Sequence, residues 1–163
     1  MTTGNKKLER LRGKLAVLQA KLARTSTSDS KALLAVYYEL TDLWHESLRV
    51  LPFSTTKSKA NSINISFRRE LKTIRDRVEI HVGRIVNEIT DNGARQVNGM
   101  PRMTGDGEWK ATFAALGFRE ARTAPYRFMT KARLADFEEH AREIVAKADR
   151  RSAAALERRV EAA

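Results

Sequence analysis

The chain of 163 residues has no cysteine, few prolines and no long apolar run. The absence of cysteine excludes disulfides, thiolate metal ligands and a thiol nucleophile. No segment approaches the roughly 18 apolar residues that a membrane span requires, and residues 1–7 lack the hydrophobic stretch of a signal peptide. We therefore expect a protein of the cytoplasm, associated with the nucleoid or a virion, with no membrane partner.

Catalytic and metal sites also lack their usual residues. The three histidines, His45, His81 and His140, fall on separate predicted helices, and residues 138–140 lack the second histidine of a zinc-binding helix. Residues 105–107 have neither the lysine nor the spacing of a phosphate-binding loop. We expect no catalytic residues, no metal and no cofactor, and we predict that the protein is not an enzyme.

Basic residues, in contrast, are in excess: 31 Lys and Arg stand against 20 Asp and Glu, a formal net charge of +11. The excess gathers in residues 1–24, 53–90 and 108–133 and is absent from the segments between them. A clustered surplus of this sign favours a polyanionic partner. We expect that partner to be nucleic acid, with double-stranded DNA as the favoured form.

Helical spacing dominates the chain, and no strand-like alternation of useful length occurs, so we predict an all-α fold. Residues 6–24 carry leucines three and four positions apart, which is the spacing of a coiled-coil seam. A second helix is predicted over residues 30–50, with Ser28 or Asp29 as its cap. The two helices form either an antiparallel hairpin or an arm whose leucine seam pairs with a second copy in a homodimer or higher homo-oligomer. The seam consists of Leu8, Leu11, Leu15, Leu18 and Leu22.

The remaining chain divides into a linker and a helical domain. Residues 53–63 are rich in Ser, Thr, Lys and Asn and are predicted to link the hairpin of residues 1–52 to a domain over residues 64–163. That domain is predicted to begin with a helix that ends near residue 91 and to finish with a long helix over residues 135–161. Heptad-like spacing in the last helix predicts packing or oligomerisation. The residues concerned are Phe137, Ala141, Ile144, Ala148 and Ala155.

Between these two helices, residues 108–133 have the pattern of a helix-turn-helix-like unit. Trp109, Phe113 and Leu116 share one face of a first helix. Gly117 supplies the turn, because glycine adopts positive φ without a Cβ clash. The second helix, which starts soon after the turn, combines a small apolar face with a basic outer face, as a recognition helix requires.

Residues 80–131 also carry a series of short motifs. These are a Gly-Arg-x-x-x-Glu segment at 83–88, Gly-Glu-Trp at 107–109, and a Leu-Gly-Phe turn followed by Arg-Thr-Ala and Tyr within 116–129. The run resembles a family of uncharacterised phage- and plasmid-borne proteins. The resemblance implies a mobile-element origin and a helix-turn-helix.

The chain departs from that family's pattern at Pro125, which falls inside the second helix of the unit. Proline in a helix interior costs about 3 kcal/mol, but the first turn tolerates it. The helix is therefore predicted to start near Thr123, with Thr123 as its cap.

We predict a DNA-binding protein of a phage or plasmid, acting in regulation, partition, replication or packaging. The alternative is a helical virion or host-interaction protein that works without catalysis, through contacts to a phage or host protein. Base contacts are predicted for Arg122, Tyr126, Arg127 and Thr130. Further contacts, chiefly to phosphates, are predicted for Lys110, Arg119, Thr123, Lys131, Arg133, Arg68, Arg69 and Lys72.

Overall fold

The computed structural model describes residues 3–51, 59–91, 96–97, 100–101, 106–120 and 123–163. Helices account for most of these residues, and the prediction of an all-α fold is confirmed. The helices are α1 (Thr3–Arg24), α2 (Ser30–Val50), α3 (Lys59–Asp91), α4 (Asp106–Leu116) and α5 (Ala124–Glu161). Two short strands, β1 (Gln96–Val97) and β2 (Met100–Pro101), pair antiparallel between α3 and α4.

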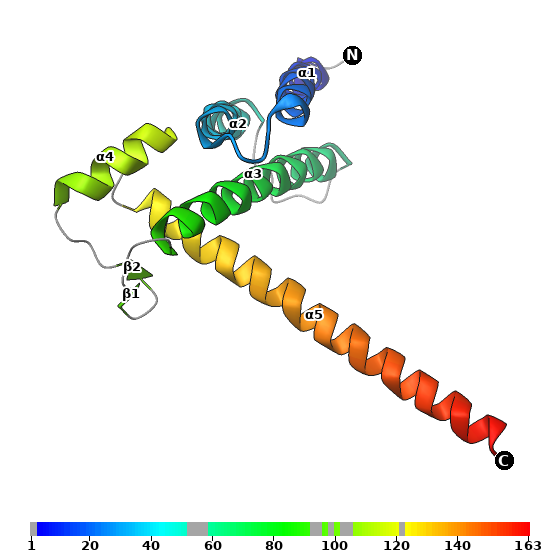
Figure 1. The fold of residues 1–163 in the computed structure, drawn as a ribbon. Coiled ribbons are helices and arrows are strands. Elements are labelled where there is room, and N and C mark those ends of the chain that lie inside the picture. The colour runs from blue at the N-terminus through cyan, green and yellow to red at the C-terminus, as the bar shows by residue number, and fades with distance from the viewer. Residues whose placement is uncertain (1–2, 52–58, 92–95, 98–99, 102–105, 121–122) are drawn as a thin grey trace.

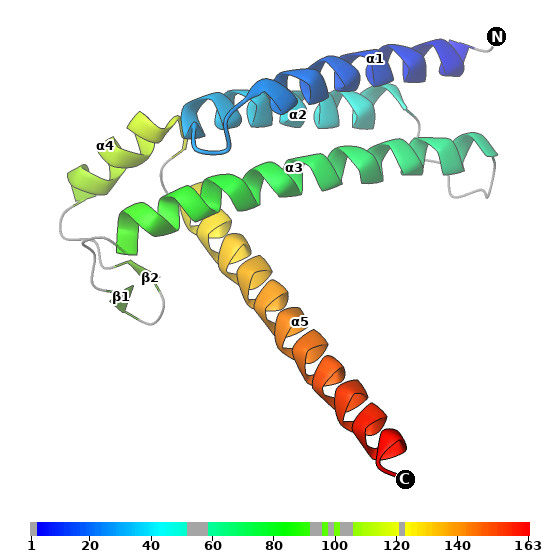
Figure 2. The same cartoon turned by 45° about the vertical axis from the view of Figure 1, so that its right-hand side comes forward.

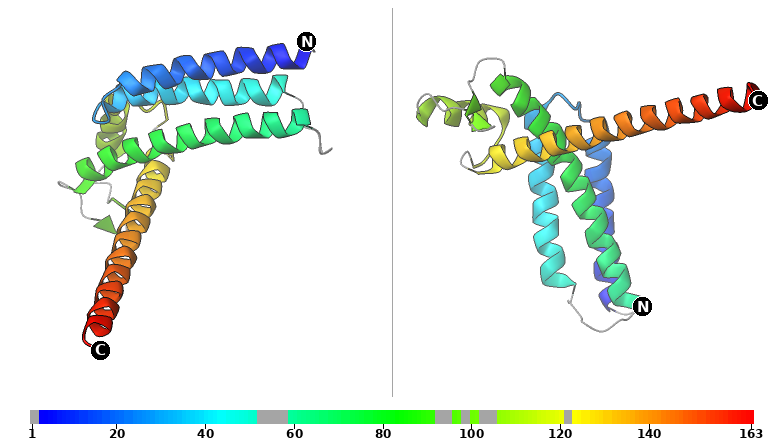
Figure 3. Two further views of the ribbon diagram at one scale, coloured as in Figure 1. Left: turned by 90° about the vertical axis from the view of Figure 1, so that its right-hand side faces the viewer. Right: turned by 90° about the horizontal axis from the view of Figure 1, so that it is seen from below.

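The first three helices lie side by side as a bundle (Figure 2). The chain reverses at each connection, so α1 and α3 run in the same direction and α2 runs against both (Figure 2). α5 crosses α3 close to its own start and then extends away from the bundle (Figures 1 and 3). α4 lies beside the end of the bundle at which α2 begins (Figure 2).

The leucine seam of α1 is covered within the chain itself. Four of its leucines are at most 8% exposed and share one core with α2 and α3, and the fifth, Leu22, packs partly against that core. The four are Leu8, Leu11, Leu15 and Leu18. In the structure, α1 and α2 pack together as an antiparallel pair (Figure 2). The prediction that the seam forms an oligomer interface is corrected, because α2 and α3 occupy the surface that a second copy would need.

The start of α2 is fixed by a side-chain cap. Asp29 precedes the helix, and its carboxylate accepts a hydrogen bond from the Ala32 amide at 3.1 Å. This bond satisfies one of the backbone donors that a helix N-terminus leaves without a helical partner. Of the two caps predicted for this helix, Asp29 is therefore confirmed.

The crossing of α5 over α3 depends on Gly83. A Cβ placed on Gly83 would lie 2.0 Å from the Phe128 carbonyl oxygen and 2.9 Å from the Ala132 Cβ, so the two helix backbones touch. Asn87, one turn further along α3, donates from Nδ2 to the Met129 carbonyl at 3.2 Å. α5 continues unbroken to Glu161, so the second helix of the predicted unit and the predicted last helix are one helix.

We predict opposite effects for two Gly→Ala substitutions in helices. Gly83→Ala should lower the free energy of unfolding by about 1–3 kcal/mol, because overpacking against a backbone outweighs the gain in helix propensity. Gly13→Ala, on α1 with nothing within 4 Å of the new Cβ, should raise it by about 0.5–1 kcal/mol. Urea denaturation of both variants checks the prediction, and stabilisation by Gly83→Ala would contradict the close crossing.

Candidate nucleic-acid interface

The turn of the predicted helix-turn-helix forms, but the unit around it is longer than expected. Gly117 has φ of +105°, and the Phe118 amide donates to the Phe113 carbonyl at 3.1 Å. α5 begins only at Ala124, whereas the helices of a DNA-binding helix-turn-helix are joined by about 3–4 residues. The tight turn is therefore confirmed, and seven residues separate the end of α4 from the start of α5.

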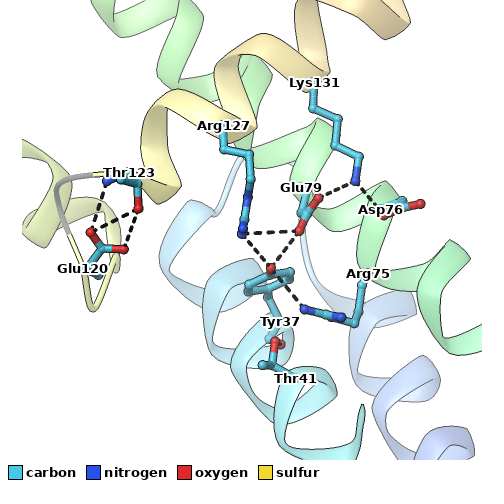
Figure 4. Close-up of polar contacts among 9 residues, drawn as sticks. All are labelled: Tyr37, Thr41, Arg75, Asp76, Glu79, Glu120, Thr123, Arg127 and Lys131. Atoms are coloured by element: carbon cyan, nitrogen blue, oxygen red, sulfur yellow. Dashed lines mark hydrogen bonds and ion pairs between the residues drawn. The ribbon is translucent and has the colours of Figure 1, made fainter. Parts of the chain in front are cut away.

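The start of α5 near Thr123 is confirmed, with Pro125 in the first turn, where proline is tolerated. The predicted capping bond is absent, because Thr123 directs its hydroxyl elsewhere. It donates to the Glu120 carboxylate at 3.0 Å, and the Thr123 amide binds the same carboxylate at 3.1 Å (Figure 4). Thr123 thus binds Glu120, which precedes α5, and does not cap the helix with its side chain.

Aromatic rings fill the space between α4, α5 and α2. Phe113 contacts Phe118 and Tyr126 edge-on, with ring centroids 6.0 and 5.8 Å apart. Phe128 contacts Tyr37 of α2 in the same manner at 5.1 Å. Tyr126 is half-buried, and burial raises its pKa. Its ring belongs to this cluster, and its predicted contact with a base stays a prediction.

A polar cluster lies where α5 crosses α2 and α3 (Figure 4). The Tyr37 hydroxyl donates to Glu79 Oε1 at 2.7 Å and accepts a longer hydrogen bond from Arg127 Nη2 at 3.3 Å. Lys131 donates from Nζ to Asp76 at 2.6 Å and also binds the Glu79 carboxylate. We call these five residues, Tyr37, Asp76, Glu79, Arg127 and Lys131, the crossing cluster.

Burial of Glu79 explains why the cluster needs its cations. Glu79 is 7% exposed, and a carboxylate removed from water is stable only when it is paired and hydrogen-bonded. Burial would lower the pKa of Lys131, but its hydrogen bonds and charge interactions with Asp76 and Glu79 raise it above the usual value. The pKa of Tyr37 is also raised, chiefly by burial and to a smaller extent by the hydrogen bond to Glu79. Lys131 therefore stays charged and Tyr37 stays neutral at physiological pH.

Two of the residues predicted to contact nucleic acid, Arg127 and Lys131, belong to the crossing cluster, and their contacts with nucleic acid stay a prediction. Lys131 is held by two acids of α3. Arg127, although 63% exposed at its side chain, has Nη2 3.7 Å from Glu79. Both cations therefore act within the chain, and their charge is already balanced by acids.

Arg68 is another of the predicted phosphate contacts, but it is 6% exposed. Its Nη2 donates to the carbonyl oxygens of Ser47 and Leu51, at 3.1 and 2.8 Å, where α2 ends. The Ser47 carbonyl also accepts from the Leu51 amide at 3.0 Å, whereas Leu51 lies just past the end of the helix. A cation at this position complements the negative end of the helix dipole. The predicted contact of Arg68 with phosphate is corrected, because its guanidinium caps α2.

The other predicted contact residues have mixed placements. Arg119 is exposed, with its guanidinium carbon 4.3 Å from the centroid of the Tyr38 ring. Arg133 is half-buried, and the exposed Thr130 donates its hydroxyl to the Tyr126 carbonyl. Arg122 lies outside the described residues. Three further predicted contact residues are, like Arg119, exposed and without an ion pair among the described residues: Lys110, Arg69 and Lys72.

Sequence reasoning gave too little weight to the cations of the bundle. Further exposed cations of α1, α2 and α3 make no ion pair with any described acid. They could have been recognised in the sequence because they lie outside the apolar stripes of these helices. They are Lys6, Lys7, Arg10, Arg12, Arg24, Lys31, Arg49 and Arg77. It also missed Asp76, Glu79 and Tyr37 as partners of α5, for which no local signal exists.

Comparisons of the chain with protein-family profiles, curated proteins and solved structures found no match. The similarity of residues 80–131 to phage- and plasmid-borne proteins therefore stays a prediction that rests on its motifs. None of the helices in the described residues combines the length and apolar character needed to traverse a bilayer.

We predict that Arg68 and its neighbour Arg69 differ sharply in their effect on stability. Arg68→Ala should lower the free energy of unfolding by about 1.5–3 kcal/mol, because it removes the hydrogen bonds of a buried charged donor. Arg69→Ala, at an exposed position, should change it by less than about 0.5 kcal/mol. Urea denaturation measures both values, and equal effects would contradict the capping role of Arg68.

A second pair of variants tests the crossing cluster. Glu79→Gln keeps the side-chain shape but removes the charge that Lys131 and Arg127 share, so it should cost about 1–3 kcal/mol. Glu88→Gln changes an exposed carboxylate on the same helix that has no ion pair among the described residues, and it should cost little. Thermal and urea unfolding check the difference, and indistinguishable variants would mean that the cluster adds nothing to the crossing.

Proposed function

We propose that the protein binds nucleic acid, with double-stranded DNA as the favoured form, through phosphate contacts made by cations of the bundle. One observation carries the proposal: exposed Lys and Arg side chains of α1, α2 and α3 have no acid partner among the described residues, in a chain of net charge +11. Cations that are not balanced inside the chain are available to a polyanion. Binding of this kind is driven by release of counterions from the phosphates.

The dimensions of the bundle suit an extended ligand. α1 and α3 contain 22 and 33 residues, which at about 1.5 Å per residue gives roughly 33 and 50 Å. A turn of duplex DNA is about 34 Å long. The unpaired cations of α1 lie within residues 6–24 and those of α3 within residues 69–77, which is about 27 and 12 Å at about 1.5 Å per residue. Cations spread in this way can meet several phosphates of one duplex, which a compact anion would not require.

Contacts to phosphates suit this surface better than base readout. Arg127 and Lys131 of α5, which were predicted to contact a base and a phosphate, bind Glu79 within the chain. Tyr126, another predicted base contact, packs on Phe113. We therefore propose binding with little sequence preference. Lys110 and Arg119, exposed near the α4 end, add charge to the same interaction. The motifs in residues 80–131 favour phage or plasmid DNA as the target, with a role in regulation, partition, replication or packaging.

A role in protein–protein contacts is the second candidate. It is favoured by the large apolar side chains that α5 exposes beyond the bundle, because such a surface is unusual in a chain that acts alone. A helical virion component or a host-interaction protein would use such a surface. The two functions are compatible, because they use different parts of the molecule.

The proposal is tested by DNA binding across a salt series with two double variants of equal charge loss. For Arg69→Ala/Lys72→Ala, the slope of log K against log salt should become shallower by about 2, because each phosphate that is no longer neutralised reduces it by about 0.9. The control is Lys14→Ala/Lys21→Ala, whose cations are already paired with Glu46 and Glu39 at 2.7 and 3.2 Å, and its slope should stay close to that of the unmodified chain.

Fluorescence anisotropy with a random-sequence duplex gives these slopes. Absence of binding at low salt would overturn the proposed function. Equal changes in the two double variants would show that net charge, and not the unpaired cations of α3, governs the interaction. Strong preference for one sequence would contradict the proposed reliance on phosphates.

A further inference from the structure

The second part of α5 stands apart from the rest of the molecule (Figures 1 and 3). Beyond Ala132 no side chain of α5 is buried, although the helix continues to Glu161. We call Leu134–Glu161 the projecting segment. Its 28 residues span about 42 Å at about 1.5 Å per residue. Apart from the ion pairs of Asp136 and Glu139 with Arg84 of α3, this part of the helix has little to stabilise it, because most helices in proteins depend on packing of an apolar face.

The projecting segment carries such a face. Six large apolar side chains on it are between 56% and 71% exposed: Leu134, Phe137, Ile144, Val145, Leu156 and Val160. At about 100° per residue they fall on one side of the helix, and on the same side the smaller Ala141, Ala148 and Ala155 follow one another at intervals of seven. Leu134 comes two residues after the buried Ala132, about 200° around the helix. The stripe therefore faces away from α3.

Charge is distributed unevenly along the projecting segment. Residues 134–145 contain four acids and one base, whereas residues 146–161 contain five bases and three acids. Arg84 of α3 balances part of the acidic half, since its Nη2 lies 2.7 Å from Asp136. The outer half remains basic. An identical helix laid alongside in the opposite direction would place acidic half against basic half twice.

We propose that the projecting segment pairs with the same segment of a second copy of this chain, in the antiparallel direction. Charge complementarity selects both the partner and the direction, because a parallel pair would bring acidic half against acidic half and basic half against basic half. The helix dipoles also oppose one another favourably in the antiparallel pair. The bundles then lie at opposite ends of the paired helices, where they do not compete for space.

The alanines set the register. With Ala148 of both copies at the two-fold axis, Ala141 of one copy faces Ala155 of the other on each side of it. Small side chains at these positions let the helices approach to the lower end of the usual interaxial distance, about 8 Å. Leu134 and Phe137 then meet Leu156 and Val160 of the second copy at both ends, which buries most of the exposed apolar stripe.

The first test is the mass of the full chain in solution, without nucleic acid, by sedimentation equilibrium over a concentration series. We expect a particle of twice the 18.4 kDa chain mass. Phe137→Glu should give a monomer, because a charge at the stripe disrupts the apolar packing at both ends of the pair. Val17→Glu is the matched control, since Val17 is an apolar side chain of α1 that is 60% exposed, and it should leave the dimer intact. A monomeric unmodified chain at its solubility limit, or a dimer unaffected by Phe137→Glu, would overturn the proposal.

The second test fixes the direction and uses the absence of cysteine from the chain. Under mild oxidation, Ala148→Cys should form a covalent dimer with itself. Ala141→Cys and Ala155→Cys should each stay monomeric on a denaturing gel but should cross-link when mixed, because a disulfide needs Cα atoms within about 7 Å. Cross-linking of Ala141→Cys to itself and of Ala155→Cys to itself would show a parallel pair and contradict the proposal.

The third test asks whether charge selects the partner. Glu138→Lys/Glu143→Lys makes both halves of the segment basic, and Arg151→Glu/Arg158→Glu makes both halves acidic. Each double variant alone should dimerise more weakly than the unmodified chain, and an equimolar mixture should form a mixed dimer. Failure of the mixture to associate more tightly than either variant alone would show that charge does not select the partner.

Discussion

The close approach of α3 and α5 at Gly83 is the contact on which the rest of the arrangement depends. No side chain stands between the two backbones, so the Phe128 carbonyl lies where a Cβ would be. The close approach brings Lys131 within hydrogen-bond distance of Asp76 and Glu79, and the Met129 carbonyl within hydrogen-bond distance of Asn87. It also fixes the direction in which α5 leaves the bundle. One glycine thereby determines which cations are used inside the fold and which surface is left outside.

What the sequence predicted correctly is local and periodic. The leucine stripe of α1, the Asp29 cap, the turn at Gly117 and the start of α5 near Thr123 each follow from neighbours within a few positions. The contacts that could not be predicted join distant helices. Lys131 lies 52 residues after Glu79, and nothing near either residue identifies the other as its partner. Arg68 and Arg69 are adjacent and chemically identical, yet rotation by one helical position buries one and exposes the other.

Packing between distant helices also decides which of the positive charges are neutralised within the chain and which are available to a ligand. Lys14, Lys21, Arg84 and Lys131 all contribute to the formal surplus, but each lies against an acid of another helix. Cations of this kind hold helices together and have little to offer a polyanion. In the part of the chain that the structure describes, the cations without acid partners belong mostly to the three helices of the bundle, and not to the segment that the motif pattern favoured. The sequence alone gives the total charge, whereas the packing of the helices determines which cations pair with acids and which stay unpaired.

The two proposed interactions reinforce one another through geometry. An antiparallel pair of projecting segments would place two bundles about 42 Å apart, at about 1.5 Å for each helical residue, which is longer than one duplex turn of about 34 Å. Each bundle would then meet its own set of phosphates on the same duplex. Binding by the first bundle would hold the second at high effective concentration near the DNA, so that affinity rises without any new contact. In the proposed complex, weak and sequence-tolerant contacts by one bundle would thus be sufficient for stable binding by the pair, and a short duplex that reaches only one bundle would not gain this advantage.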